Sequence, residues 1–241
     1  MALNAGQTAS GEVSDWDTPA TKALAALLDS RFSCRGFRPD PVPQPVITRI
    51  LGLAQRTASW CNSQPWQVVV TSGQATERFR VALYRHAAEH ESEPDFPFPR
   101  EYRGIYLERR RTCGFQLYEA VGVARGDRAA GGRQAMENFR LFGAPHVAII
   151  TTDEALGVYG AVDCGSYVGN FVLAAQSMGV ATIAQAALAR HSKFVRAHFG
   201  LGDDRMMVCG ISFGFEDASH PANRFRTSRA SIEDAVTRID E

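Results

Sequence analysis

Apolar residues recur along the chain with two different spacings, and these spacings predict a mixture of helices and strands. A recurrence every three or four positions predicts helices over residues 19–29, 46–54, 76–86, 102–124, 128–142, 156–178 and 192–199. Short, nearly continuous apolar runs predict strands over residues 66–71, 145–151, 180–183 and 206–213. The strands are few and do not alternate regularly with the helices, so the pattern favours an α+β fold over a doubly wound α/β fold.

Residues suited to capping mark several of the predicted helix ends. Thr18 is placed to cap the first helix, and Gly179 is placed to end the long helix over 156–178. Ser192 is expected to cap the helix over 192–199. Ser231 and Asp234 have the spacing of a capping box, which predicts a last short helix near the end of the chain.

The pattern indicates a polar tail followed by one domain. Residues 1–17 lack an apolar segment and are expected to be a flexible N-terminal tail, and residues 18–241 form the domain. Within it, the proline-rich stretch 91–99 and the next two predicted helices make a helical lid or insertion over about 91–142. The chain has 241 residues, 45% of them hydrophobic, and is therefore long enough to bury a sizeable core.

Composition excludes several classes of partner. The 26 basic and 26 acidic residues cancel, so no overall field favours nucleic acid or a membrane. Five cysteines without a CxxC pair argue against a disulfide scaffold or a zinc ribbon, and no secretory signal is apparent, so we expect a cytoplasmic protein with no metal site. The long apolar stretch 155–178 contains Asp163, Asn170 and Gln176, which predicts a buried helix and not a membrane span.

Two motif matches for other chemistries lack the context that they need. Gly210, Ser212 and Gly214 match the nucleophile elbow of serine hydrolases, but the chain after them is loop-like where that motif needs a helix. We interpret them as part of a buried strand. His86 and His90 are spaced to share a metal ion, which leaves a zinc peptidase as an alternative, although no clear third ligand follows. We interpret them as solvated histidines at a helix end.

A short segment after the first helix carries candidate anion-binding groups. Arg31, Ser33 and Arg35 occupy alternate positions, and in an extended segment alternate side chains point the same way. Two guanidinium groups and a hydroxyl in a row can hold a phosphate through charge-assisted hydrogen bonds. The alternative is a solvated loop, and this motif alone does not decide between the two.

A second polar cluster precedes the first predicted strand. Asn62, Ser63 and Gln64, followed by Pro65 and Trp66, place two amides and a hydroxyl at a turn. An amide offers both donors and an acceptor, so it suits the polar edge of a flat heterocycle. The alternative is ordinary turn chemistry beside a tryptophan of the core.

Together, the R-x-S-x-R segment and the N-S-Q-P-W segment about 30 residues later resemble the nitroreductase family of FMN-dependent oxidoreductases. The resemblance continues in GVATIAQAA over 179–187, and in CGISFG over 209–214 followed by Asn223, Arg226 and Arg229. It covers about residues 18–231, and the arginine-rich stretch 100–140 looks most like the nitrobenzoate-reductase branch. It implies an α/β sandwich of the α+β class, with a central, mostly antiparallel sheet flanked by helices.

The resemblance also implies which residues bind FMN. These are Arg31, Ser33, Arg35, Asn62, Ser63, Gln64, Gln185, Ala186, Arg226 and Arg229. The arginines and Ser33 would hold the phosphate and ribityl end, with Arg35 at the pyrimidine edge of the flavin. Residues 62–64 would bond the polar edge of the ring, and Gln185 and Ala186 would lie against the ring with a backbone N–H near its N5.

The implied reaction is a ping-pong transfer of hydride from NADPH or NADH through the flavin to a nitroaromatic such as nitrobenzoate, or to a quinone. The flavin carries the chemistry, so no catalytic side chain is expected. Two alternatives stay open. One is another flavin reaction on the same fold, either reductive dehalogenation or flavin destruction. The other is a non-catalytic flavin-binding protein.

The family fold further implies an intertwined homodimer with two FMN sites at its interface. Ala161, Gly165, Gly169 and Ala174 on the long helix are small and would let a partner helix approach closely. The alternative for this helix is the central core helix of a monomer.

The predicted lid supplies candidate substrate contacts. Phe96, Tyr102 and Phe115 would stack on an aromatic substrate, and Arg103, with neighbouring arginines, would pair with a substrate carboxylate or with the 2′-phosphate of NADPH. The alternative is a solvated helical face.

Overall fold

The structure is a computed structural model that describes residues 17–240. Within these residues a four-stranded sheet is built from β1 (Gln67–Ser72), β2 (His146–Asp153), β3 (Ala181–Gln185) and β4 (Arg205–Gly214). The strands lie in the order β1-β2-β4-β3, and each neighbouring pair is antiparallel. The expected α+β class and antiparallel sheet are confirmed. The predicted tail, residues 1–17, lies outside the described residues except for its last position.

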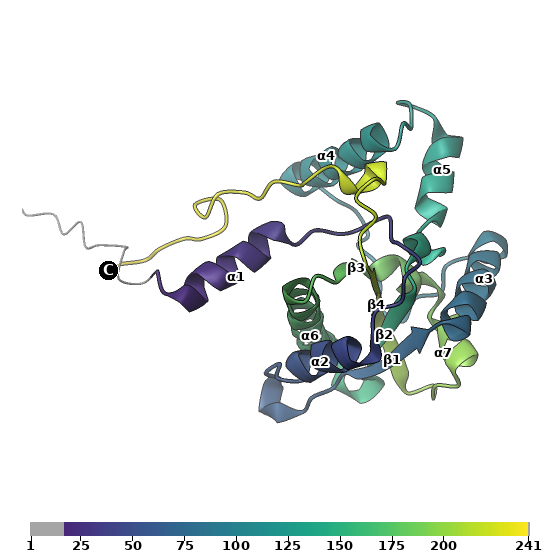
Figure 1. The fold of residues 1–241 in the computed structure, drawn as a ribbon, viewed down its shortest axis with the longest axis horizontal. Helices are drawn as coiled ribbons and strands as arrows, with labels where there is room; N and C mark the ends of the chain where they lie inside the picture. Colours follow the sequence, from purple (N-terminus) through teal and green to yellow (C-terminus); the bar gives the residue numbers. More distant parts are fainter. Residues whose placement is uncertain (1–16, 241) are drawn as a thin grey trace, which may run out of the picture.

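Helices cover both faces of the sheet, which gives a three-layer arrangement (Figure 1). α2 (Gln44–Ala54) and α6 (Gly157–Ser177) pack on one face, and α3 (Gln74–Glu89) and α7 (Ser192–Phe199) pack on the other. Each face has its own cluster of buried hydrophobic side chains. Residues 147–150 of the inner strand β2 are fully buried, as their continuous apolar run predicts.

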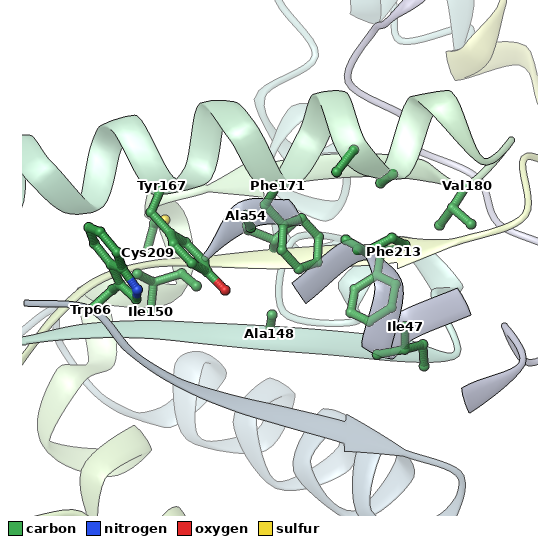
Figure 2. Close-up of a cluster of buried hydrophobic side chains, with 14 of the residues drawn as sticks. Ile47, Ala54, Trp66, Ala148, Ile150, Tyr167, Phe171, Val180, Cys209 and Phe213 are labelled. Atoms are coloured by element: carbon green, nitrogen blue, oxygen red, sulfur yellow. The ribbon is translucent and has the colours of Figure 1, made fainter. Parts of the chain in front are cut away.

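The buried cluster beneath α6 fixes the long helix to the sheet. Tyr167 and Phe171 point from α6 toward the sheet, where they meet Trp66 and Phe213 (Figure 2). The rings of Trp66 and Tyr167 are stacked with centroids 5.1 Å apart, and Phe171 meets Phe213 edge-on at 5.6 Å. Burying a large apolar side chain contributes about 1.5–3 kcal/mol. These four rings therefore hold α6 firmly in place.

Three helices lie outside these layers: α1 (Pro19–Ser30), α4 (Gly104–Ala120) and α5 (Arg128–Met136). α1 and the C-terminal segment project away from the sheet in the same direction (Figure 1). No residue of α1 is buried, and Leu24 and Leu28 of its apolar stripe stay half exposed. A single chain therefore does not cover this stripe. Short 3₁₀ helices connect the elements: η2 (Trp60–Asn62), η3 (Leu141–Gly143), η4 (Glu154–Leu156), η5 (Ala186–His191) and η6 (Pro221–Asn223).

Several helix boundaries differ from the predicted ones. Prolines at 39, 41, 43 and 45 predict no helix before residue 46, but α2 begins at Gln44 because Pro45 sits in its first turn, where no backbone N–H is needed. α4 ends at Ala120, short of residue 124, and Gly122 follows it with a φ of 71°. α5 ends at Met136, short of residue 142: residues 137–140 continue as turns, and Leu141 and Phe142 then turn the chain toward β2 with φ of 58° and 51°.

The four predicted capping signals have different outcomes. Thr18 does cap α1, since its hydroxyl accepts a 3.2 Å bond from the N–H of Thr21. Gly179 follows α6 with a φ of 70°, as a helix-ending glycine does. The prediction for Ser192 is wrong: His191 occupies the cap position of α7, and the Ser192 hydroxyl donates to the carbonyl oxygen of Ala189.

The prediction of a last short helix near the end of the chain is also wrong. Ser231 and Asp234 do exchange reciprocal hydrogen bonds of 3.3 Å, but only a turn follows them. Ile232 and Val236 are 64% and 51% exposed, so the helix would have no surface on which to pack. Short helices without tertiary contacts are only marginally stable in water, which explains why residues 231–236 form a turn and no helix.

Candidate functional site

The R-x-S-x-R segment extends the sheet at its outer edge. Ser33 bridges to Thr182 of the edge strand β3 in the parallel sense, and the N–H of Cys34 donates to the carbonyl oxygen of Thr182 at 3.0 Å. The segment is therefore extended, as the alternation of Arg31, Ser33 and Arg35 requires.

One buried side chain joins this segment to the C-terminal part of the chain. The side-chain oxygen of Asn223 accepts a 2.7 Å bond from the N–H of Arg35, and its amide donates to the carbonyl oxygens of Gly36 and Asp217. Gly36 has no room for a side chain, since an added Cβ would lie 2.3 Å from the ring of His220. The two segments are thus locked together.

A cavity of about 240 Å³ opens where these segments meet the end of α1. We call it the phosphate cavity, and its lining includes Arg31, Ser33, Arg35, Arg226 and Arg229. The family resemblance assigns Arg31, Ser33, Arg226 and Arg229 to the phosphate and ribityl end of FMN and Arg35 to the pyrimidine edge of the flavin, and the fold brings all five together. Thr227 and Cys113 also line it, the latter from α4.

The phosphate cavity carries excess positive charge. Among the described residues, none of its four arginines forms an ion pair, and Asp29 is the acidic residue in its lining. Burial lowers the pKa of the Arg35 guanidinium, because charge is costly where water is excluded. Arg226 lies over the ring of Phe32, 3.6 Å from its centroid, and bonds to the carbonyl oxygen of Asn223. Such a site suits a phosphate dianion.

The N-S-Q-P-W loop forms a separate structure. Cys61, Asn62 and Gln64 all have positive φ, of 51°, 55° and 47°. Backbone of this kind costs free energy in residues other than glycine and often occurs at functional sites. The N–H of Gln64 donates to the hydroxyl of Ser59 at 2.9 Å, and the Gln64 side chain bonds to Gln55 at the end of α2.

This loop rests on the outer side of α6 and does not line the phosphate cavity. The backbone N–H of Trp60 donates to Asp163 at 3.1 Å, and the ring of Trp60 meets that of Tyr159 at 4.8 Å. Residues 62–64 are exposed. One chain therefore does not bring the two halves of the expected cofactor site together.

Gln185 and Ala186 lie at the end of β3. The Gln185 side chain is buried: its amide donates to Asn138 at the end of the α5 segment, and its oxygen accepts a 2.5 Å bond from the Ser212 hydroxyl. Only its backbone is thus available to a ring. Ala184 and Ala186 are exposed, and the segment that contains Arg35 runs beside β3 through the bridge between Ser33 and Thr182.

The four candidate substrate residues do not share one cavity. Phe115 lines a cavity of about 770 Å³ between α4 and α5. Phe96, Tyr102 and Arg103 do not line that cavity. Tyr102 lies under the guanidinium of Arg110 at 5.1 Å, and Arg103 is paired with Glu101. Their role in substrate binding stays a prediction.

The start of the predicted lid is anchored, which sequence reasoning missed. Asp95 and Arg196 of α7 form a 2.5 Å ion pair that is almost entirely buried, and Asp95 also accepts a 2.7 Å bond from the N–H of Met207 in β4. No spacing along the chain signals these partners, because they come from elements about 100 positions away.

The motifs for other chemistries have structural roles. Ser212 is fully buried inside β4, which confirms its interpretation as part of a strand. His86 and His90 stack with centroids 4.1 Å apart, and burial lowers the pKa of His86. Across residues 17–240, no three His, Cys, Asp or Glu side chains are grouped as metal ligands. In the same range no helix is long and apolar enough to cross a membrane.

Comparison with known proteins decides the family. Residues 28–215 match the model of the Nitroreductase family. The chain belongs to the nitroreductase family. The expectation drawn from the two short motifs is confirmed.

Several relatives of this nitroreductase-family chain can be aligned with it over most of its length. The nitroreductase NfnB of Mycolicibacterium smegmatis is 36% identical over 217 residues, covering 89% of this chain and 92% of that protein. The 4-nitrobenzoate reductase of Nocardioides sp. is 31% identical over 227 residues, covering 91% of both chains. A crystal structure of the FMN-dependent nitroreductase NfnB from Mycobacterium smegmatis in complex with NADPH has a TM-score of 0.87 at 34% identity, covering 92% of this chain and 100% of that one.

Proposed function

We propose that this chain is an FMN-dependent oxidoreductase that passes hydride from NADPH or NADH to nitroaromatic acceptors such as nitrobenzoate, or to quinones, by a ping-pong mechanism. The relatives support the reaction class, since they include an FMN-dependent nitroreductase in complex with NADPH, a nitrobenzene nitroreductase and 4-nitrobenzoate reductases. The observation that carries the proposal is the convergence on the phosphate cavity of Ser33 and four arginines that form no ion pair with any residue from 17 to 240.

The residues present fit FMN. Arg31, Arg226 and Arg229 would neutralise the phosphate, and Ser33 would bond to the phosphate or ribityl oxygens. The backbone of Arg35 is fixed by the bond from its N–H to Asn223, and its guanidinium donates to the carbonyl oxygen of Ser33 at 3.1 Å in the lining of the cavity. Bound flavin would supply the hydride chemistry. The chain's own contribution is binding, orientation and positive charge, and no catalytic side chain is needed.

We further propose that the active form is a homodimer whose second copy completes each site. Residues 62–64 are exposed and lie away from the phosphate cavity of their own chain, so the amides of a partner would complete it. The outer face of α6 carries largely exposed apolar side chains: Val158, Tyr159 and Val162 are 66%, 59% and 58% exposed. Gly165 and Gly169 on this helix have no neighbour within 4 Å of an added Cβ. A partner helix has room to pack there.

A cytoplasmic location is part of the proposal. All five cysteines are free, and Cys34, Cys164 and Cys209 are buried as thiols. Burial raises the pKa of the Cys34 thiol to about 11 and that of Cys164 to about 12, so neither is reactive. Free thiols in this number suit a reducing compartment.

The competing functions are another flavin reaction on the same fold and flavin binding without turnover. Anaerobic visible spectroscopy of the purified protein separates them. We expect flavin absorption that bleaches with NADPH and returns when a nitroaromatic is added. Bleaching without return would favour a different acceptor, and flavin that NADPH does not bleach would favour a binding protein. Protein that neither contains nor takes up FMN would refute the proposal.

A further inference from the structure

The cavity between α4 and α5, which measures about 770 Å³, is separate from the proposed cofactor site. It shares no lining residue with the phosphate cavity, and none of the residues that the family resemblance assigns to FMN lines it. Its volume lies in the range of about 300–1,000 Å³ that is typical of sites for small organic ligands. A ligand held here would therefore occupy a second site, away from the residues expected to contact the flavin.

Aromatic side chains from α4 form one wall of this cavity, and glycines from α5 leave it open. Phe115 and Tyr118 line it from α4, and Phe115 is 53% exposed, so its ring has little packing within the chain. Gly131 and Gly132 line it from α5, and a Cβ added at Gly131 would lie 3.4 Å from the Tyr118 hydroxyl oxygen. A flat ring has room beside Phe115, and aromatic pairs are favourable beyond the area that they bury.

Charged groups of both signs line the same cavity without pairing. Glu119 comes from the last turn of α4, and Arg128 is the first residue of α5. In the range 17–240, neither side chain forms an ion pair or a hydrogen bond. Arg125, in the turn between the helices, lies over the ring of Phe115, 5.9 Å from its centroid. The cavity therefore offers a hydrogen-bond acceptor from α4 and positive charge from the turn and α5.

We propose that this cavity binds a small aromatic carboxylic acid that carries an amino group, such as 4-aminobenzoate. The ligand carboxylate would pair with Arg125 and Arg128, and its ring would pack on Phe115. Its amino group would donate a hydrogen bond to the carboxylate of Glu119. The inference goes beyond the proposed function, because none of these contacts requires flavin or NADPH.

Glu119 gives the site a preference for an amine over a nitro compound. The oxygens of a nitro group only accept hydrogen bonds, and an ionised carboxylate also only accepts them. 4-Nitrobenzoate would therefore place acceptor against acceptor, whereas 4-aminobenzoate, its fully reduced form, places a donor there. Asp127 also lines the cavity, but its carboxylate already accepts a 2.8 Å bond from the N–H of Ala130. The site thus distinguishes the reduced compound from the acceptor of the proposed reaction.

The test is a calorimetric titration of the purified full chain, with its bound flavin, by 4-aminobenzoate and by 4-nitrobenzoate. A ligand of this size is expected to bind with a dissociation constant of about 0.1–1 mM. We expect 4-aminobenzoate to bind the wild-type protein in this range. We expect 4-nitrobenzoate to displace it from this cavity only at concentrations about fivefold higher or more, because one hydrogen bond is lost.

A substitution that fills the cavity locates the binding. An added Cβ at Gly132 meets no atom within 4 Å, and leucine suits a helix better than glycine, so Gly132→Leu should fold. It should weaken 4-aminobenzoate binding by about tenfold or more, while the absorption spectrum of the bound flavin stays the same. Gly52→Leu is the matched control, since Gly52 is an exposed glycine of α2 that also has no neighbour within 4 Å. It should leave the dissociation constant unchanged.

Two further substitutions separate the roles of the charged groups. Glu119→Gln introduces an amide that both donates and accepts, so it should remove the preference and bring the two compounds within about twofold of each other. Arg128→Gln should weaken both compounds by about threefold to fivefold, because both carry the carboxylate.

Three results would overturn the inference. In the first, wild-type protein binds no 4-aminobenzoate in the millimolar range. In the second, Gly132→Leu binds it as the wild type does, which would place the ligand elsewhere, such as against the flavin. In the third, the preference for the amine survives Glu119→Gln. Protein that holds no FMN and still binds 4-aminobenzoate in a Gly132-dependent way would refute the proposed function and support this inference.

Discussion

The side-chain oxygen of Asn223 accepts a 2.7 Å hydrogen bond from the backbone N–H of Arg35, and this bond joins two segments 188 positions apart in the chain. The amide of the same side chain donates to the carbonyl oxygens of Gly36 and Asp217 at 2.8 and 2.9 Å. Asn223 is 3% exposed, so water does not replace these bonds. The geometry of the phosphate cavity thus depends on one uncharged side chain.

Replacing that side chain should weaken both the fold and the cavity. Asn223→Ala leaves the N–H of Arg35 and two carbonyl oxygens without their partner, and each such buried group costs about 1–3 kcal/mol. We expect urea unfolding to show a loss of about 2–4 kcal/mol, and FMN titration to show weaker binding. Ser219→Ala removes only an exposed bond to Asp217 and is the control, with an expected change below about 0.5 kcal/mol. Equal losses of unfolding free energy in the Asn223 and Ser219 variants would contradict the role of Asn223 in joining the two segments.

The outer face of α6 supplies a prediction about assembly. Val162 is 58% exposed and lies between Tyr159 and Gly165 on this face. If two copies pack through it, Val162→Arg buries a charge without a partner, which is strongly unfavourable. Light scattering should then show a monomer, with FMN affinity reduced because residues 62–64 of the second copy are absent. Val81→Arg, at an equally exposed valine on α3, should leave the dimer intact. A wild-type monomer, or a dimer that survives Val162→Arg, would exclude this face.

The sequence predicts the sheet and the central helix well, because both are marked by local apolar patterns. The run at 147–150 is buried on both faces of an inner strand, and α6 begins and ends within one residue of the predicted limits. The alternation of Arg31, Ser33 and Arg35 also predicts an extended segment, and the structure shows one beside β3. Their role in cofactor binding stays a prediction.

What the sequence does not predict depends on tertiary contacts. Ser231 and Asp234 have the local signal of a helix, but the helix has no surface to pack against in one chain. Gln185 sits at a position expected to face the flavin ring, but the alternation along β3 turns its side chain inward to Ser212 and Asn138. The role of Asn223 requires two ends of the chain to meet, which no spacing encodes.

The buried histidines predict how stability depends on pH. The Nε2 atom of His146 accepts a 2.9 Å bond from the N–H of Val42, so the ring is neutral with its proton on Nδ1, 3.1 Å from the carbonyl oxygen of Thr71. Burial lowers the pKa of His146, and it lowers that of His191 to about 4. The unfolded chain therefore binds these protons first as pH falls.

We thus expect the free energy of unfolding to be steady above about pH 6.5 and to fall below it, by at most about 1.4 kcal/mol per pH unit for each histidine. Urea unfolding at pH 7.5, 6 and 5 measures this. His146→Gln keeps an acceptor for Val42 but cannot titrate, so it should lose less stability between pH 7.5 and 5 than the wild type. If the variant loses as much stability between pH 7.5 and 5 as the wild type does, His146 does not contribute to the pH dependence.

The ion pair at the start of the predicted lid gives a prediction with an internal control. Asp95 and Arg196 are each 12% exposed, and Asp95 also holds the N–H of Met207. Removing one partner of a buried pair leaves the other charge uncompensated, so Asp95→Ala should lower the free energy of unfolding by about 3–5 kcal/mol.

Two positions earlier, Glu93 pairs with Lys193 of the same helix α7, but these side chains are 60% and 70% exposed. Solvent screens an exposed pair, so Glu93→Ala should cost less than about 1 kcal/mol. The difference should also appear in limited proteolysis: Asp95→Ala should expose residues 91–103 to cleavage, because Asp95 fixes this segment to α7 and β4, whereas Glu93→Ala should not. Equal stability and equal cleavage of the two variants would show that the segment is anchored by its other contacts, such as the 2.7 Å bond from the N–H of Glu93 to the carbonyl oxygen of Arg190.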